Sequence, residues 1–184
     1  MASVLVPLAQ GCEELEAVTI IDLLRRADIK VITASLDGCP IKASRGTIII
    51  ADATLDHVLA QDFDMVVLPG GLPGADHLNA DDRIHHLLQR TANNNKYIAA
   101  ICAAPKVLAS AGLLENKKAT AYPGVLEALE LEHTEVTTAA VQQDGNIFTS
   151  RSPGTAMDFA LELISCLAGD AMRKQVEAEL QRPS

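Results

Sequence analysis

The stretch 98–108, IAAICAAPKVL, constrains most strongly what this chain can fold into. Its first half is a short apolar run with the length and β-branched content of a buried strand. Its second half, from Ala103 onward, has the pattern of a helix, because Pro105 suits a first turn, where its missing N–H costs nothing. Cys102 stands where the strand becomes the helix. The stretch therefore predicts a tight turn between the two elements with a thiol on it.

The surroundings of such a turn determine what its thiol can do. A side chain there faces the free N–H groups and the positive end of the helix. This setting lowers a thiol pKa from about 8.5 into a range of roughly 3.5 to 7.5. The layout matches the nucleophile elbow, with Cys102 in the place of the usual serine. The alternative is a small buried hydrophobe, since free cysteine is among the most buried residue types. The stretch alone leaves both interpretations open.

Strand patterns alternate with helical ones along the 184 residues, and short loops join them. We expect strands at 3–8, 29–34, 41–43, 47–50, 65–68, 98–101, 119–122, 136–141 and 146–149. We expect helices at 13–26, 81–94, 125–131 and 156–167, and others that begin at Ala103 and after Gly169. The last two strands flank Asp144 and Gly145, which predicts a hairpin. The alternation indicates a mostly parallel sheet with helices on both faces, hence one doubly wound α/β domain over residues 1–184.

Charge and cysteine usage exclude several functional classes. The 24 acidic and 15 basic residues give a net charge of −9. A phosphate backbone is repelled by such a chain, so we expect no direct nucleic-acid binding. No apolar run approaches the length of a membrane span, and the chain opens on a strand rather than a signal peptide. The four cysteines show no C-x-x-C spacing, which favours reduced thiols in a cytoplasmic protein. No His or Cys spacing resembles a zinc site, and we expect no metal.

A ligand of a doubly wound sheet sits beyond the carboxyl ends of its strands. The loops expected there are 9–12, 69–74, 102–104 and 122–124. Gly70 and Gly71 follow a buried strand directly, so a backbone N–H can approach a substrate oxygen closely. With the N–H of Ala103 it would form an oxyanion hole. The alternatives for the glycine pair are a tight structural turn or a phosphate loop, and the known phosphate-binding patterns are absent.

Three glutamates, Glu13, Glu14 and Glu16, begin the first expected helix. Glu13 and Glu14 suit the positive end of a helix as surface groups. Glu16 has apolar neighbours, so we expect it to face inward, where burial raises a carboxyl pKa and keeps the group protonated at neutral pH. A protonated Glu16 hydrogen-bonded to the Cys102 thiolate would be a matched acid/base pair.

We expect no histidine to act as the base beside Cys102. A Cys-His protease or amidotransferase needs an imidazole beside its nucleophile, whereas Ala103 follows Cys102 here. His85 and His86 are neighbours on an expected helix and cannot face one another. The other three histidines fall on polar stretches, which favours solvated side chains.

Five segments in the same order resemble the ThiJ/PfpI superfamily, and its YajL-like branch in particular. They are GCEELE at 11–16, SRG at 44–46, VLPGG at 67–71, AAICAAP at 99–105 and TSRSPGT at 149–155. The resemblance implies a flavodoxin-like fold, a homodimer and a reactive, readily oxidised Cys102. It also implies a protonated Glu16 at the sulfur, and backbone N–H groups of Gly71 and Ala103 that stabilise an oxyanion or a cysteine sulfinate.

The resemblance further implies cofactor-independent glyoxalase III-type and protein deglycase activity in oxidative and carbonyl stress. Its substrates would be methylglyoxal and glyoxal or their adducts on proteins and nucleotides. The Cys102 thiolate would form a hemithioacetal, Glu16 would move a proton between carbons, and water would release lactate or glycolate. The alternative is a redox-sensing chaperone, a holdase, whose Cys102 becomes a sulfinate without turnover.

The chain departs from the family pattern at two positions near the thiol. Tyr122 stands where many members carry a histidine, so Glu16 would have to do more of the proton transfer. Cys12 replaces a small alanine or serine, and is either a resolving thiol for Cys102 or a spectator.

Overall fold

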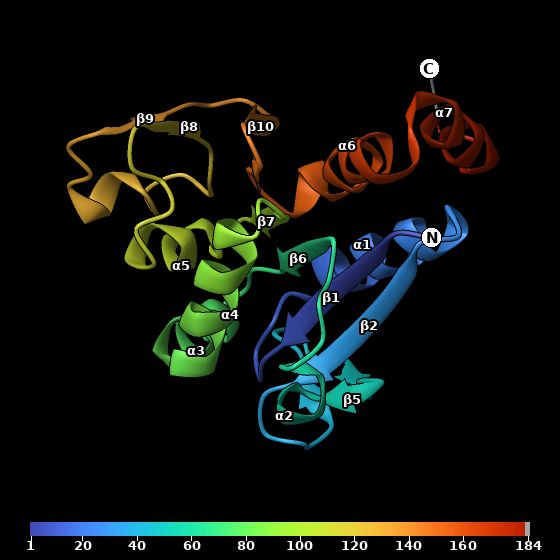
Figure 1. Ribbon diagram of the computed structural model, residues 1–184, viewed down its shortest axis with the longest axis horizontal. Helices are drawn as coiled ribbons and strands as arrows, with labels where there is room; N and C mark the ends of the chain where they lie inside the picture. Colours follow the sequence, from blue (N-terminus) through green and yellow to red (C-terminus); the bar gives the residue numbers. More distant parts are fainter. Residues whose placement is uncertain (183–184) are drawn as a thin grey trace.

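A seven-stranded sheet runs through the middle of the protein in the computed structural model, which describes residues 1–182 (Figure 1). The strand order is β10-β11-β7-β6-β1-β2-β5. All neighbours are parallel except β10 and β11, which form the expected hairpin. The strands are β1 (Ser3–Leu8), β2 (Lys30–Ser35), β5 (Ala53–Thr54), β6 (Met65–Leu68), β7 (Tyr97–Ile101), β10 (Val141–Asp144) and β11 (Ile147–Ser150). The order β2-β1-β6-β7-β11 is the flavodoxin-like one, which confirms the expected fold class.

Helices cover both faces of this sheet. One face carries α1 (Glu14–Arg26), α6 (Ala156–Ala168) and α7 (Asp170–Glu179). The other carries α2 (Leu55–Val58), α3 (Gly74–Ala80), α4 (Asp82–Asn93) and α5 (Pro105–Ser110). Side chains of β1 alternate between the two cores, with Val4 and Val6 toward α1 and Leu5 toward α4. Figure 1 shows α3 and α4 on the side of the strands away from α6 and α7.

The helices begin and end where local chemistry allows. In α1 the acidic residues lie in the first turn and Arg25 and Arg26 in the last, as the helix dipole favours. A capping box of Ser152 and Thr155 precedes α6. Within the described residues, no helix is both long and apolar enough to cross a membrane.

The structure corrects the expected elements between β7 and β11. The strand expected at 119–122 is β8 (Lys117–Ala119), which pairs with β9 (Thr134–Val136) in a separate two-stranded sheet. The helix expected at 125–131 is only a 3-10 turn, Glu127–Leu129. Leu126 is the buried residue of that segment, and one apolar contact is too little to stabilise so short a helix. The strand expected at 136–141 is replaced by β9 and β10, because the turn at Gly145 sets the hairpin register.

Other differences are smaller. The short strands expected near 41–43 and 47–50 are confirmed as the antiparallel pair β3 (Ile41–Lys42) and β4 (Ile48–Ile49). Helices α2 and α3 were not expected. Pro73 and Gly74 gave the start of α3 the pattern of a loop, although Pro73 takes the N-cap position of that helix.

Candidate active site

Cys102 occupies a strained turn between β7 and α5. Its φ of +63° lies in the left-handed region, which costs a residue other than glycine on the order of 1–3 kcal/mol. Two backbone bonds hold it there: its N–H donates to the carbonyl of Ser150 at 2.9 Å, and its carbonyl accepts from the N–H of Tyr122 at 2.9 Å. The helix expected from Ala103 begins two residues later, at Pro105, which lies in its first turn as expected. The geometry is that of a nucleophile elbow.

The loop after β6 presses against this turn. A Cβ atom on Gly70 would lie 2.7 Å from the carbonyl oxygen of Ile101 and 2.8 Å from Cβ of Cys102. Gly71 has a φ of +89°, and a Cβ there would lie 2.3 Å from the nitrogen of Glu13. The two glycines are therefore required by close backbone approach to the elbow and to the start of α1.

Glu16 lies on α1 and is fully buried against the elbow. Its Oε2 accepts a hydrogen bond from the N–H of Gly70 at 2.8 Å. Its Oε1 has no hydrogen-bond partner among the described residues, and the neighbouring thiol of Cys102 interacts with the carboxyl and lowers its pKa in part. Burial raises the pKa of Glu16 to about 7, although the bonds from Cys102 and Gly70 lower it in part. The expectation of an inward-facing glutamate with a raised pKa is confirmed.

The thiol of Cys102 behaves differently from the expectation. Burial, followed by the charge of Glu16, raises the pKa of Cys102 to about 12, while backbone N–H groups of Gly71 and Ala103 lower it in part. The expected lowering of the thiol pKa is therefore wrong. Helix α5 has six residues and begins three positions beyond the thiol, so its dipole is too weak to offset burial and a neighbouring carboxylate.

Cys102 and Glu16 consequently titrate as a pair. Above about pH 7 the pair holds one proton, which the raised pKa of the thiol places on the sulfur at rest. Moving this proton from the sulfur to Oε1 of Glu16 creates no net charge. It places the negative charge on the sulfur, which accepts from two backbone N–H groups, whereas the carboxyl accepts from one. The arrangement can therefore present a thiolate beside a carboxylic acid.

A cavity of about 460 Å³ opens above the thiol. Its polar side consists of Glu13, Ser44 and Arg45. Its apolar side consists of Leu72, Tyr122, Val125 and Pro153, and Gly71, Cys102 and Ala103 form its floor. The structure thus brings together the residues predicted for the site: Cys102, Glu16, Gly70, Gly71, Ala103 and Tyr122.

The polar side of the cavity contains residues to which sequence reasoning gave no role. Ser44 donates its hydroxyl to Oε2 of Glu13 at 2.7 Å. Glu14 accepts the N–H groups of Arg45 and Thr47, and these bonds outweigh desolvation and lower the pKa of Glu14 to about 2. Of the two glutamates expected as surface groups, Glu13 lines the cavity, and Glu14 anchors the segment that carries Arg45. The segment 44–46 is one of the five that carry the family resemblance, together with the segment of Cys102. That resemblance was the sequence evidence that could have placed Ser44 and Arg45 at the site.

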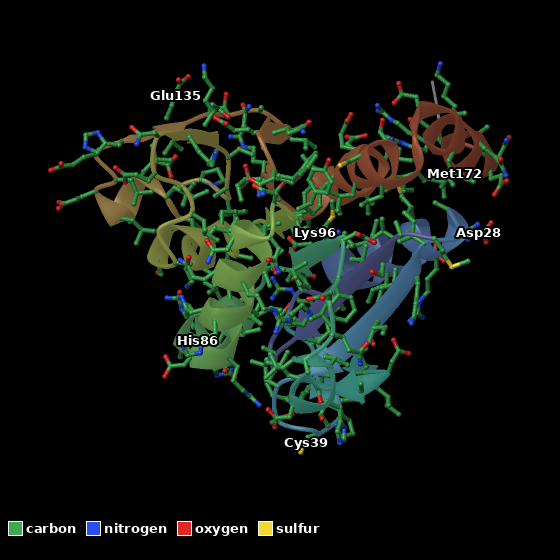
Figure 2. The ribbon with its side chains drawn as sticks, in the orientation of Figure 1. Asp28, Cys39, His86, Lys96, Glu135 and Met172 are labelled. Atoms are coloured by element: carbon green, nitrogen blue, oxygen red, sulfur yellow. The ribbon has the colours of Figure 1, made fainter. Side chains whose placement is uncertain are left out.

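The other three cysteines lie away from the cavity lining. Cys12 is fully buried, and burial followed by the charges of Glu14 and Glu13 raises its pKa to about 11. Because it is fully buried and does not line the cavity, Cys12 fits the spectator role better than the resolving role. Figure 2 shows Cys39 at the rim of the molecule near β5 and α2, and His86 on the outer side of α4. Between residues 1 and 182, no group of three or more His, Cys, Asp or Glu side chains is placed to hold a metal.

The chain is similar to known proteins over nearly its whole length. The DJ-1/PfpI family matches residues 2–166. Protein dj-1beta of Drosophila melanogaster is 43% identical over 175 residues, 95% of this chain and 94% of that protein. Its crystal structure superposes with a TM-score of 0.95 at 40% identity and covers 100% of this chain and 99% of the other.

Two further similarities bear on chemistry. The glutathione-independent glyoxalase DJR-1.2 of Caenorhabditis elegans is 32% identical over 168 residues, 91% of this chain and 89% of that protein. The oxidized structure of Toxoplasma gondii DJ-1 has a TM-score of 0.94 at 36% identity and covers both chains fully.

Proposed function

The chain belongs to the DJ-1/PfpI family, and from this premise we propose that it is a cofactor-independent glyoxalase III-type enzyme and protein deglycase. Its substrates are methylglyoxal and glyoxal or their adducts on proteins and nucleotides. One observation carries the proposal: the thiol of Cys102 contacts the buried carboxyl of Glu16 at the floor of an open cavity. The C. elegans relative that is named a glutathione-independent glyoxalase supports small aldehydes as the substrate class.

The first chemical step is addition of the sulfur to the aldehyde carbon. The proton of the pair moves from the sulfur to Glu16, the thiolate forms the S–C bond, and the C=O π electrons move to oxygen. The N–H groups of Gly71 and Ala103, which point at the sulfur, lie where they stabilise the oxyanion. Glu16 then delivers its proton to that oxygen, which gives a neutral hemithioacetal and a carboxylate.

The second step is an internal redox exchange that needs no cofactor. The Glu16 carboxylate removes the hydrogen of the thiol-bearing carbon as a proton, and the resulting enediol takes a proton on the neighbouring carbon. The former aldehyde carbon is thereby oxidised to a thioester, and its neighbour is reduced to an alcohol. Water attacks the thioester, the S–C bond breaks, and lactate leaves from methylglyoxal or glycolate from glyoxal. Tyr122, which bounds the cavity without a titrating imidazole, leaves the proton transfer to Glu16.

Lactate formation from methylglyoxal tests this proposal. We expect Cys102→Ser to abolish turnover and Glu16→Gln to lower kcat by about 10²–10⁴-fold, the usual contribution of a positioned acid/base. Cys39→Ser, at an exposed position, is the matched control and keeps full activity. Turnover by Cys102→Ser at the parent rate would refute the proposal.

A second function is favoured by the same two N–H groups, since they also suit a sulfinate on Cys102. In this role the protein is a redox-sensing chaperone in oxidative stress, and an oxidized structure of a relative agrees with it. Mild hydrogen peroxide is then expected to add two oxygen atoms to Cys102 alone, as measured by intact mass and peptide mapping. Oxidation spread over all four cysteines would count against this role.

We also propose that the protein acts in the cytoplasm as a homodimer. Four apolar side chains on and beside α1 and β4 support the dimer, because each is at least half exposed: Leu15, Val18, Ile48 and Ile50. Exposed apolar side chains on neighbouring elements are typical of a surface that a second chain covers.

A further inference from the structure

We propose that the preferred carbonyl substrate bears an aromatic or branched apolar substituent, which lies on an apolar shelf of the cavity. The shelf is defined by Leu72, Tyr122 and Val125. This inference rests on the function proposed above and names the substrate class within it. It predicts that arylglyoxals are better substrates than methylglyoxal.

The size of the cavity is the first argument. A volume of about 460 Å³ lies within the range of sites that hold drug-sized ligands. A three-carbon aldehyde on Cys102 would leave most of this space to water. The cavity therefore has room for a large substituent beside the reacting carbon.

The exposure of the shelf is the second argument. Leu72 is 59% exposed and Tyr122 is 50% exposed, and both line the open cavity. Covering such side chains with an apolar group removes their surface from water. The ring of Tyr122 can in addition form an offset stack with an aryl group.

Backbone links hold the shelf close to Cys102. Leu72 directly follows Gly71, whose N–H faces the sulfur. The N–H of Tyr122 donates to the carbonyl of Cys102 at 2.9 Å, and the N–H of Val125 donates to the carbonyl of Tyr122 at 3.0 Å. Each shelf residue is thus held by backbone at a fixed position relative to the thiol, as a specificity pocket requires.

The polar lining residues of the cavity disfavour an apolar group beside them. Glu13 is an acidic side chain bonded to Ser44, and Arg45 adds a cation. An aryl group directed there would desolvate charged groups without replacing their hydrogen bonds. The substituent is therefore directed toward the shelf, and the carbonyl oxygens toward the N–H groups and the polar wall.

The test compares kcat/KM for phenylglyoxal and methylglyoxal, each divided by its rate of adduct formation with a free small thiol. We expect the normalised ratio to exceed about tenfold in the parent, since one apolar group in a fitted pocket is worth at least that much. Tyr122→Ala and Leu72→Ala each lower the ratio by about threefold or more, whereas Tyr122→Phe retains it. Leu129→Ala, an exposed apolar position outside the cavity, leaves both constants unchanged.

A labelling experiment separates this inference from the proposed activity. Cys102 is alkylated with N-benzyl iodoacetamide or iodoacetamide, and the two rates are normalised to a free thiol. A preference for the benzyl reagent that Tyr122→Ala removes supports the shelf even if neither aldehyde is turned over, in which case only the proposed function fails. If the normalised ratio of the two aldehydes is near one, or if neither alanine variant changes it, the proposed role of the shelf is wrong. Turnover of methylglyoxal would still support the proposed function.

Discussion

The backbone N–H of Gly70 donates to Oε2 of Glu16 at 2.8 Å, so the loop after β6 fixes the carboxyl that contacts the thiol at the end of β7. Three neighbouring parallel strands thus supply one site: β1 leads into α1 and Glu16, β6 into Gly70, and β7 into Cys102. The carboxyl's free oxygen is left to the sulfur because Gly70 occupies the other one. One oxygen of Glu16 is therefore held by the backbone, and the carboxyl also faces the thiol of Cys102.

Replacing Gly70 by alanine is expected to disrupt the elbow. The added Cβ would meet the Ile101 carbonyl and Cβ of Cys102 below 3 Å, so Gly70→Ala lowers the free energy of unfolding by about 1–3 kcal/mol and impairs activity. Denaturant unfolding and aldehyde turnover measure the two effects. The control is Gly154→Ala, whose Cβ would meet only the Ser152 hydroxyl at 3.7 Å. Equal stability of the two variants would contradict the close approach.

Glu16 should make stability depend on pH in a definite direction. Burial raises its pKa from 4.5 to about 7, so the folded protein holds this proton more tightly than the unfolded chain. Its contribution to stability is complete below about pH 4.5, falls between about pH 4.5 and 7, and is gone above that range, for a loss of about 3 kcal/mol.

Unfolding curves at successive pH values check this prediction. The free energy of unfolding of Glu16→Gln is expected to lack the decline that the parent shows between pH 5 and 7. Glu132→Gln, at an exposed position, keeps the parent's slope. Parallel curves for the parent and Glu16→Gln would show that the carboxyl is not buried as described.

The four thiols are expected to differ in their accessibility. Cys39 is exposed and Cys12 is fully buried, and burial raises the pKa of Cys12 to about 11. Iodoacetamide at neutral pH therefore labels Cys39 in the folded protein, and labels Cys12 only after unfolding. Peptide mapping after timed labelling follows each residue. If Cys12 is labelled as fast as Cys39, Cys12 is accessible and could act as a resolving thiol.

The proposed dimer can be separated by charge. Val18→Glu combined with Ile48→Glu places like charges on the exposed apolar side chains of α1 and β4. These charges repel one another across the contact and lose their hydration there. Sedimentation is expected to show a dimer for the parent and a monomer for the double variant. Leu129→Lys is the control at an exposed apolar position elsewhere. If the parent sediments as a monomer, the proposed dimer is wrong.

Much of this site was predictable from the sequence. The elbow follows from Cys102 between an apolar strand and a proline-started helix, and the inward Glu16 from its apolar neighbours. The sequence shows only a glycine pair at 70–71, from which the close contact of Gly70 with the elbow could not be predicted. The thiol pKa could not be predicted, since it depends on how burial and Glu16 outweigh a short helix. The polar wall at Ser44 depends on contacts between distant segments, which local patterns do not encode.

The segment between β7 and β11 was the least predictable part of the fold. The strand expected at 119–122 shares only Ala119 with β8, which ends there and pairs outside the main sheet. Tyr122 still reaches the cavity, because its N–H bonds to the carbonyl of Cys102 rather than to a neighbouring strand. The location of Tyr122 was thus predicted correctly from an incorrect element.

Titration of Cys102 in the parent and in Glu16→Gln tests whether the two groups are coupled. It is followed by thiolate absorbance, with Cys102→Ser as the blank. The charge of Glu16 raises the pKa of Cys102, after burial itself, so removing the charge should lower it. We expect a clear fall in the Cys102 pKa from about 12 toward its usual value of 9.0. An unchanged titration in Glu16→Gln would contradict the coupled pair on which the proposed chemistry depends.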